Sequence, residues 1–132
     1  RRNAERHEQQ DRIEFLQGDL LEPVLDRSDF DVILSNPPYI PSADVDALDP
    51  GVRDHEPRLA LDGGPDGLDV VRRLVAQAAV ALKPGGRLMM EIGAGQDESV
   101  RELIAAHAEF SVLPTVCDLQ GHPRIVHAQK RS

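Results

Sequence analysis

The segment from residue 30 to residue 38 sets the strongest limit on how this chain can fold. Residues 30–35 (FDVILS) are almost all apolar after Asp31, which is typical of a strand buried on both faces in a parallel sheet. Asn36-Pro37-Pro38 must end that strand, because consecutive prolines offer no backbone donors to a ladder. The segment therefore favours a layered α/β domain, in which ligands bind beyond the carboxyl ends of the strands.

Apolar periodicity divides the rest of the chain into alternating helices and strands. Residues 12–17 alternate polar and apolar side chains and predict a strand that ends at Gly18-Asp19. The further elements we expect are helices over 67–83 and 96–109 and strands over 87–92, 111–116 and 124–128. The last two strands flank a turn-forming segment, which predicts an antiparallel hairpin at the edge of a parallel sheet.

Residues 41–65 follow neither period. They contain four prolines and the turn-forming Asp62-Gly63-Gly64, and an excursion of this length between core elements is usually functional or disordered. Eight acids and two arginines lie between Ala43 and Asp69. This acidic excess suits a solvated loop better than a metal site, and it can also complement a basic protein partner.

Composition excludes several classes of function. A chain of 132 residues suffices for one core, and its net charge of −8 opposes broad binding to phosphate backbones. One cysteine excludes an internal disulfide framework, and no apolar run approaches the ~18–20 residues of a membrane span. Cys117, His122 and His127 lack the paired spacing of zinc ligands, so we expect a cytoplasmic protein without a metal centre.

Asn36-Pro37-Pro38-Tyr39 is the most specific chemical signal in the sequence. The Asn side-chain carbonyl and the backbone carbonyls left free beside the prolines can together accept both hydrogens of a planar NH₂ group. Tyr39 adds a flat face on which an amide or a base can stack. Such a set suits methyl transfer to a weakly nucleophilic nitrogen, where positioning and oriented acceptors carry the catalysis. The competing interpretation is a strand terminator followed by a surface tyrosine.

This motif resembles that of Rossmann-like amino methyltransferases that use S-adenosylmethionine. The chain as a whole resembles the HemK-type protein-glutamine N5-methyltransferases, which modify the Gly-Gly-Gln loop of peptide chain release factors. The matching segments are residues 2–4, 18–20, 35–41, 52–57, 60–68, 82–86, 91–93, 118–121 and 124–126. Asn-Pro-Pro-Tyr alone is shared with adenine-N6 DNA methyltransferases, whereas the Arg53-x-x-Glu56-Pro57 segment and the following Asp-Gly-Gly turn favour the glutamine branch.

For the acceptor site, the resemblance implies that Asn36, Pro37, Pro38 and Tyr39 form the pocket for the glutamine side-chain amide. Asn36 would also lie near the methyl group of the cofactor.

For the cofactor, the resemblance implies that Asp19 and Leu20 hold adenine, through a carboxylate and a backbone amide. Taken alone, Gly18-Asp19 is an ordinary turn.

In the long excursion, the resemblance points to Arg53 and Glu56. They would either contact the substrate or form an ion pair that pins the loop.

The resemblance also implies that residues 1–132 are the substrate-binding half of a class I methyltransferase domain. The family places its first strands and a Gly-rich cofactor loop upstream of the segment that matches Asn3-Ala4, so we expect the chain alone to bind S-adenosylmethionine weakly or not at all. Residues 91–95 (EIGAG) imitate such a loop, but no third glycine follows.

We therefore expect a cytoplasmic, S-adenosylmethionine-dependent enzyme that methylates a release-factor glutamine, with nucleic acid involved only indirectly through the ribosome. Two alternatives stay open. An adenine-N6 nucleic-acid methyltransferase would meet the same hydrogen-bond pattern on a flipped base, but the charge of −8 opposes it. A non-catalytic fragment that binds a protein partner is the other.

Overall fold

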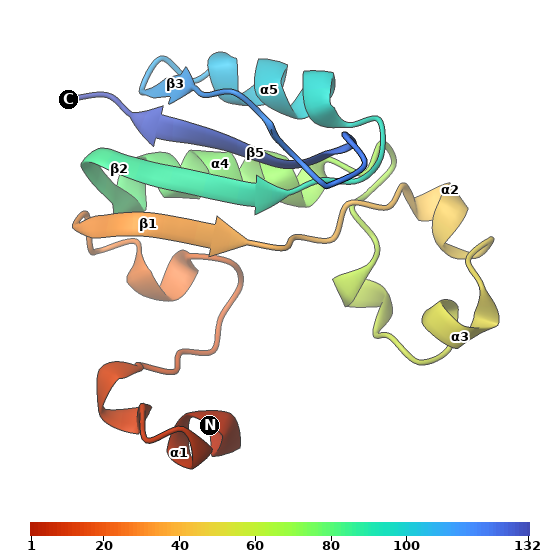
Figure 1. Ribbon diagram of the computed structural model, residues 1–132, viewed down its shortest axis with the longest axis horizontal. Helices are drawn as coiled ribbons and strands as arrows, with labels where there is room; N and C mark the ends of the chain where they lie inside the picture. Colours follow the sequence, from red (N-terminus) through yellow and green to blue (C-terminus); the bar gives the residue numbers. More distant parts are fainter.

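The computed structural model describes residues 1–132 and has a five-stranded mixed sheet at its centre (Figure 1). Helices α4 and α5 pack against one face of this sheet. The helices are α1 (Arg2–Arg6), α2 (Ser42–Val45), α3 (Pro50–Arg53), α4 (Asp69–Ala81) and α5 (Asp97–Ala105), with 3₁₀ turns η1 (Gln10–Arg12), η2 (Glu22–Val24) and η3 (Arg58–Ala60). The strands are β1 (Phe30–Ser35), β2 (Leu82–Glu91), β3 (Phe110–Val112), β4 (Val116–Cys117) and β5 (Pro123–Lys130).

The strand order is β1-β2-β5-β3, with β4 also paired to β5. β1 and β2 are parallel, whereas β5 runs antiparallel to β2, β3 and β4. The predicted hairpin is confirmed as β4 and β5. It lies at one edge of the sheet, as predicted: β3 and β4 are outermost, and β5 lies between them and the parallel pair β1 and β2, where its Val126 and Ala128 are fully buried.

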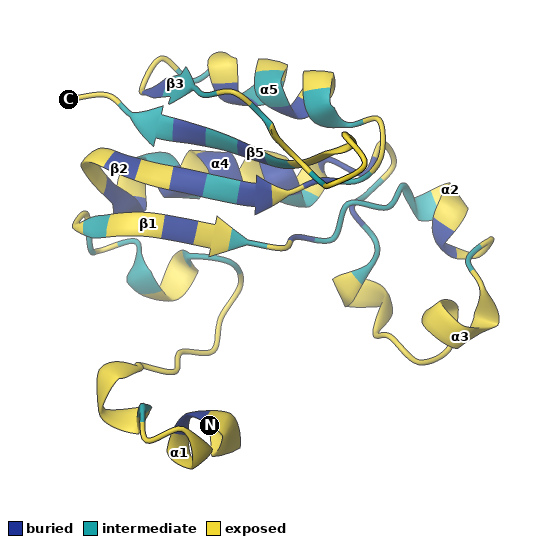
Figure 2. Cartoon of the chain, viewed as in Figure 1, coloured by how far each residue is buried: buried dark blue, intermediate teal, exposed yellow.

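The core lies between the sheet and the two long helices. Apolar residues of α4 recur every three or four positions and meet the alternate side chains of β2 and β5 in one cluster of 16 buried residues. Each buried Val, Leu or Ile side chain contributes about 1.5–3 kcal/mol, so this cluster stabilises the whole layer. Figure 2 shows the burial concentrated here. No helix has both the length and the apolar character needed to cross a bilayer.

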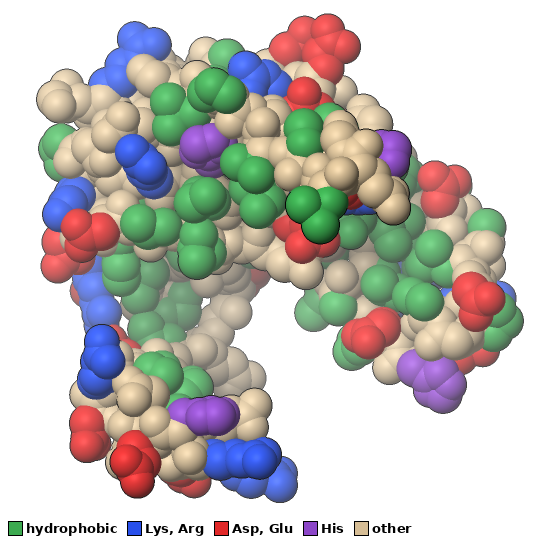
Figure 3. Space-filling model, viewed as in Figure 1, with side chains coloured by type: hydrophobic (Ala, Val, Ile, Leu, Met, Phe, Trp, Pro, Cys, Tyr) green, Lys and Arg blue, Asp and Glu red, His purple; other side chains and the backbone are tan.

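The other face of the sheet is open, which contradicts the expectation that β1 is buried on both faces. Val32 and Leu34 are 48% and 73% exposed, while Ile33 between them is buried against the helices. Hydrophobic side chains gather over β1 and β2 on this face (Figure 3). β1 also pairs with a strand on one side only, so its second edge is free.

The strand predicted over residues 12–17 is wrong. Arg12 ends the 3₁₀ turn η1, and residues 13–17 are a coil with no paired neighbour, in which Ile13, Phe15 and Leu16 are 43–50% exposed. Alternation alone does not make a strand, because the backbone groups of a strand need a partner.

The remaining differences are local. The expected strand over 111–116 is divided into β3 and β4, with Pro114 in the interruption, where it offers no ladder donor. α5 ends at Ala105, short of the helix end expected at residue 109, so Ala108 lies beyond the helix and is exposed. The excursion over 41–65 forms α2, α3 and η3, a mostly exposed lobe beside the ends of β1 and β2 (Figures 1 and 2).

Candidate acceptor site at the end of strand β1

A cavity of about 370 Å³ opens where β1 ends. One wall is the segment that follows β1 and the other comes from the lobe. The lining residues are Asn36, Pro37, Pro38, Tyr39, Ile40, Glu56, Ala60 and Leu61. The structure therefore brings together the four motif residues and one of the two loop residues that the sequence singled out.

Asn36 is exposed and its side chain makes no hydrogen bond within the protein. Pro37 is buried, which fixes the backbone at this point, and its carbonyl accepts no backbone hydrogen bond. Two acceptor groups are thus free beside one cavity. They can receive the two hydrogens of a primary amide without breaking any contact of the folded chain.

Tyr39 is half-buried, and its hydroxyl donates to Glu91 Oε1 over 3.5 Å. Its backbone is fixed by the next residue, because Ile40 N–H donates to Leu61 O (3.0 Å) and Gly63 N–H donates to Ile40 O (2.8 Å). Burial raises the pKa of the Tyr39 phenol, and the Glu91 carboxylate raises this pKa further. The tyrosine is therefore held as a neutral, flat wall of the cavity.

Tyr39 is the only tyrosine of the chain, so an absorbance titration reports on it alone. We expect its pKa to lie above the ordinary value of about 10. Because folding favours the neutral phenol, the stabilisation is complete below the unfolded pKa and is lost as pH rises through the folded pKa. Glu91→Gln should lower the Tyr39 pKa in part, whereas Glu102→Gln, at an exposed position of α5, should leave it unchanged. A Tyr39 pKa at or below 10 in the folded parent would contradict this assignment.

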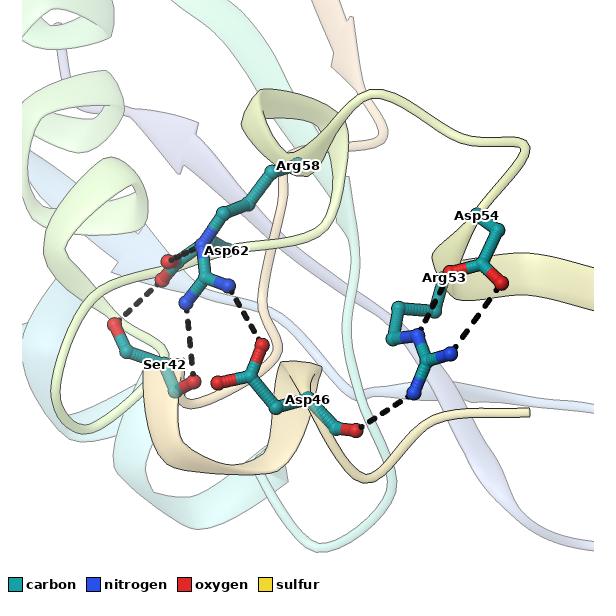
Figure 4. A network of polar contacts seen from close by, with 6 residues as sticks. All are labelled: Ser42, Asp46, Arg53, Asp54, Arg58 and Asp62. Atoms are coloured by element: carbon teal, nitrogen blue, oxygen red, sulfur yellow. Dashed lines mark hydrogen bonds and ion pairs between the residues drawn. The ribbon is translucent and has the colours of Figure 1, made fainter. Parts of the chain in front are cut away.

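Arg58 organises the lobe wall of the cavity (Figure 4). Its guanidinium donates to Asp46 (2.9 Å), to Asp62 (3.1 Å) and to the backbone carbonyl of Ser42 (3.4 Å). Asp62 also accepts from Ser42 Oγ (2.6 Å) and from Gly64 N–H (3.0 Å), and these bonds, with Ser42 first, lower its pKa. Since the lining residues Ala60 and Leu61 lie between Arg58 and Asp62, this network fixes the wall.

The two loop residues predicted from the sequence are placed differently. Glu56 lines the cavity. Arg53 does not line it, because its guanidinium pairs with the neighbouring Asp54 and donates to the carbonyl of Asp46 (Figure 4). The position of Arg53 therefore suits a role in holding the lobe.

Asp19 and Leu20 lie away from this cavity. The Asp19 carboxylate pairs with Arg73 of α4, and Leu20, at a φ of +51°, lines a cavity of about 600 Å³ along the free edge of β1. Leu34 lines that cavity and also a third one, of about 340 Å³, which includes Asn36. The three cavities therefore follow one another along β1.

Sequence reasoning missed two residues that hold the lining of the cavity in place, Arg58 and Gln96. Arg58 is one of two arginines in an acidic segment, and only its i,i+4 spacing to Asp62 indicates a role. Gln96 donates from Nε2 to the backbone carbonyl of Tyr39 over 2.8 Å, across 57 positions of sequence, and no local pattern predicts that contact.

No family model matches this chain, whereas individual proteins match it strongly. The release factor glutamine methyltransferase of Geobacter sulfurreducens is 50% identical over 125 residues, which cover 95% of this chain and 43% of the relative. That of Gloeobacter violaceus is 48% identical over 124 residues, with coverages of 94% and 43%. The chain thus spans less than half the length of these curated relatives.

Solved structures of methyltransferases also resemble this chain. The release factor-specific protein-(glutamine-N5) methyltransferase of Alicyclobacillus acidocaldarius superposes with a TM-score of 0.54 at 27% identity, over 86% of this chain and 56% of that chain. The Mtq2–Trm112 complex of E. cuniculi, responsible for methylation of the eRF1 termination factor, gives 0.56 at 20% identity, over 98% and 68%. These comparisons confirm the predicted resemblance and the class I methyltransferase fold.

Proposed function

We propose that this chain forms the acceptor-binding part of an enzyme that transfers a methyl group from S-adenosylmethionine to the side-chain amide nitrogen of a release-factor glutamine. One observation carries the proposal. The unpaired Asn36 side chain, the free Pro37 carbonyl and the Tyr39 ring border one cavity, in a chain about half identical to release factor glutamine methyltransferases. The whole motif is therefore available to a ligand.

Each residue of the cavity has its own role in the proposed reaction. Asn36 Oδ1 and the Pro37 carbonyl accept the two N–H groups of the glutamine amide, while the Tyr39 ring packs on its plane. This grip turns the nitrogen lone pair out of conjugation, so that it can attack in line. S-adenosylmethionine supplies an electrophilic methyl group on a sulfonium. Transfer of that methyl group would replace the S–C bond by an N–C bond and make the amide nitrogen acidic, so that it would then lose its proton to solvent.

Asp19 and Leu20 are proposed to hold the adenine of the cofactor. In support, Leu20 and Asn36 line neighbouring cavities that share Leu34. The Asp19 carboxylate is about half exposed in its pair with Arg73, so it has oxygen lone pairs free for an exocyclic amine. The free edge and the open face of β1 further support the proposal that residues 1–132 are the substrate-binding half of a larger methyltransferase domain.

The lobe is proposed to receive the backbone of the protein substrate. Glu56 reaches the cavity, and the acidic side chains of the lobe favour a basic partner such as a release-factor loop over a nucleic acid. Release factors act in the cytoplasm, which is therefore the compartment that this activity implies.

The test is methyl transfer from labelled S-adenosylmethionine. The enzyme is a chimera in which this chain replaces the matching segment of the Geobacter sulfurreducens protein, with the 132-residue chain assayed in parallel. We expect label on a release factor that carries Gly-Gly-Gln, and none on its Gln→Ala variant or on duplex DNA. Label on DNA adenine, or a folded, cofactor-binding chimera that labels no release factor, would overturn the proposal.

A further inference from the structure

We propose that Gln96 is a positioning residue that fixes the acceptor cavity, by tying the backbone of Tyr39 to the turn that follows β2. This inference rests on the proposed function only in taking the cavity as the place where the acceptor amide is held. The contact itself belongs to the folded chain.

The Gln96 side chain uses both ends of its amide. Its Oε1 accepts from Gly93 N–H (2.8 Å), and its Nε2 donates to Tyr39 O (2.8 Å). Gly93 follows β2 and Tyr39 follows β1, so one side chain joins the loops beyond two neighbouring parallel strands. Both bonds are partly buried, which strengthens them relative to bonds in water.

Only a side-chain amide of this length can both accept from Gly93 N–H and donate to the Tyr39 carbonyl. A glutamate could still accept from Gly93, but its second oxygen would face the Tyr39 carbonyl oxygen at the same place, and two acceptors repel each other. The packing leaves little room for rearrangement. A Cβ on Gly93 would lie 2.9 Å from both Gln96 Oε1 and the Tyr39 ring, and one on Gly67 would lie 2.4 Å from Tyr39 O.

The two hydrogen bonds of Gln96, which we call the tie, affect the cavity through the Tyr39 peptide. On its far side, Ile40 is already paired with Leu61 and Gly63. Gln96 holds the near side, so the Tyr39 ring and the preceding Pro38 keep a fixed direction in the cavity wall. Without the bond to Gln96, this peptide keeps only the hydrogen bond from Ile40 N–H to Leu61 O, and a small loss of orientation at the reacting amide lowers turnover.

The first experiment reads the position of Tyr39 directly in the 132-residue chain. The chain has one tyrosine and no tryptophan, so its intrinsic fluorescence comes from Tyr39 alone. We expect Gln96→Glu to raise the acrylamide quenching constant about twofold, since a ring that loses its anchor becomes more accessible. The melting temperature should change little, because a carboxylate at the start of α5 interacts favourably with the helix dipole.

Two further variants keep this experiment decisive. Gln129→Glu is the matched control, because Gln129 donates to the Gly85 carbonyl (3.0 Å) at the far end of β2, and quenching should not change. Gln96→Met is uncharged and of similar length, removes both bonds and should raise quenching as Gln96→Glu does. If Gln96→Glu fails to fold by circular dichroism, Gln96→Met decides the test.

The second experiment measures methyl transfer by the chimera. We expect Gln96→Glu to lower kcat about tenfold with the KM for S-adenosylmethionine unchanged, since the bond orients the acceptor and not the cofactor. Unchanged quenching in both Gln96 variants would overturn the inference whatever the activity. Raised quenching with unchanged kcat would also overturn it, because Gln96 would then be merely structural. Raised quenching in a chain whose parent chimera methylates nothing would leave the tie standing and reject the proposed function.

Discussion

Replacing Asn36 with alanine is expected to reduce methyl transfer by about 10²–10³-fold, the usual cost of removing one oriented polar group from a reacting centre. Stability should change by no more than about 0.5 kcal/mol, because the Asn36 side chain is exposed and has no hydrogen-bond partner to lose. Labelled transfer by the chimera and urea unfolding of the chain measure the two effects. Their separation distinguishes a ligand-binding group from a structural one.

Two control variants sharpen this result. Asn36→Asp keeps an oxygen acceptor at the same place, so it should retain more activity than Asn36→Ala. Asn3, the only other asparagine, is exposed in α1, and Asn3→Ala should leave both transfer and stability as in the parent. If Asn36→Ala methylated a Gly-Gly-Gln substrate at the parent rate, the acceptor site would have to be sought elsewhere.

Half of the lining of the candidate site could be predicted from sequence because it is one continuous segment. Asn36 to Tyr39 are consecutive, and the prolines that end β1 also leave the acceptor carbonyls free. The long helix α4 was equally predictable, because Val71, Leu74, Val75 and Ala78 keep a helical period and all face the core.

Features that depend on neighbours could not be predicted. Residues 12–17 have the alternation of a strand, but no strand lies beside them, so none of them joins the sheet. The two arginines of the lobe have similar acidic surroundings in sequence. Only the folding of η3 toward α2 lets Arg58 bind the Asp46 side chain and so hold the cavity wall, whereas Arg53 reaches only the backbone carbonyl of Asp46. The Gln96 contact with Tyr39 depends on the parallel pairing of β1 and β2, which sequence spacing does not encode.

Gly67→Ala is expected to be the most destabilising glycine substitution in the chain. Gly67 has a φ of +78°, where any other residue is strained, and a Cβ there would lie 2.4 Å from the backbone oxygen of Tyr39. That oxygen cannot retreat, because it accepts from Gln96 and the next residue is paired with the lobe. We expect a loss of about 3 kcal/mol or more in the free energy of unfolding, together with a lower rate of methyl transfer.

Gly85 and Gly95 provide the matched control for this effect. Both have a φ of +79°, but a Cβ on either would meet nothing within 4 Å. Alanine at these positions should therefore cost only the backbone term, about 1 kcal/mol, and the difference from Gly67→Ala measures the close contacts of the added Cβ, of which that with Tyr39 O is the shortest. Combining Gly67→Ala with Gln96→Met should cost less than the sum of the two, since both act on one peptide. Equal losses in the free energy of unfolding for Gly67→Ala and Gly95→Ala would mean that the Tyr39 peptide moves aside at no cost, and the cavity wall would then not be preorganised.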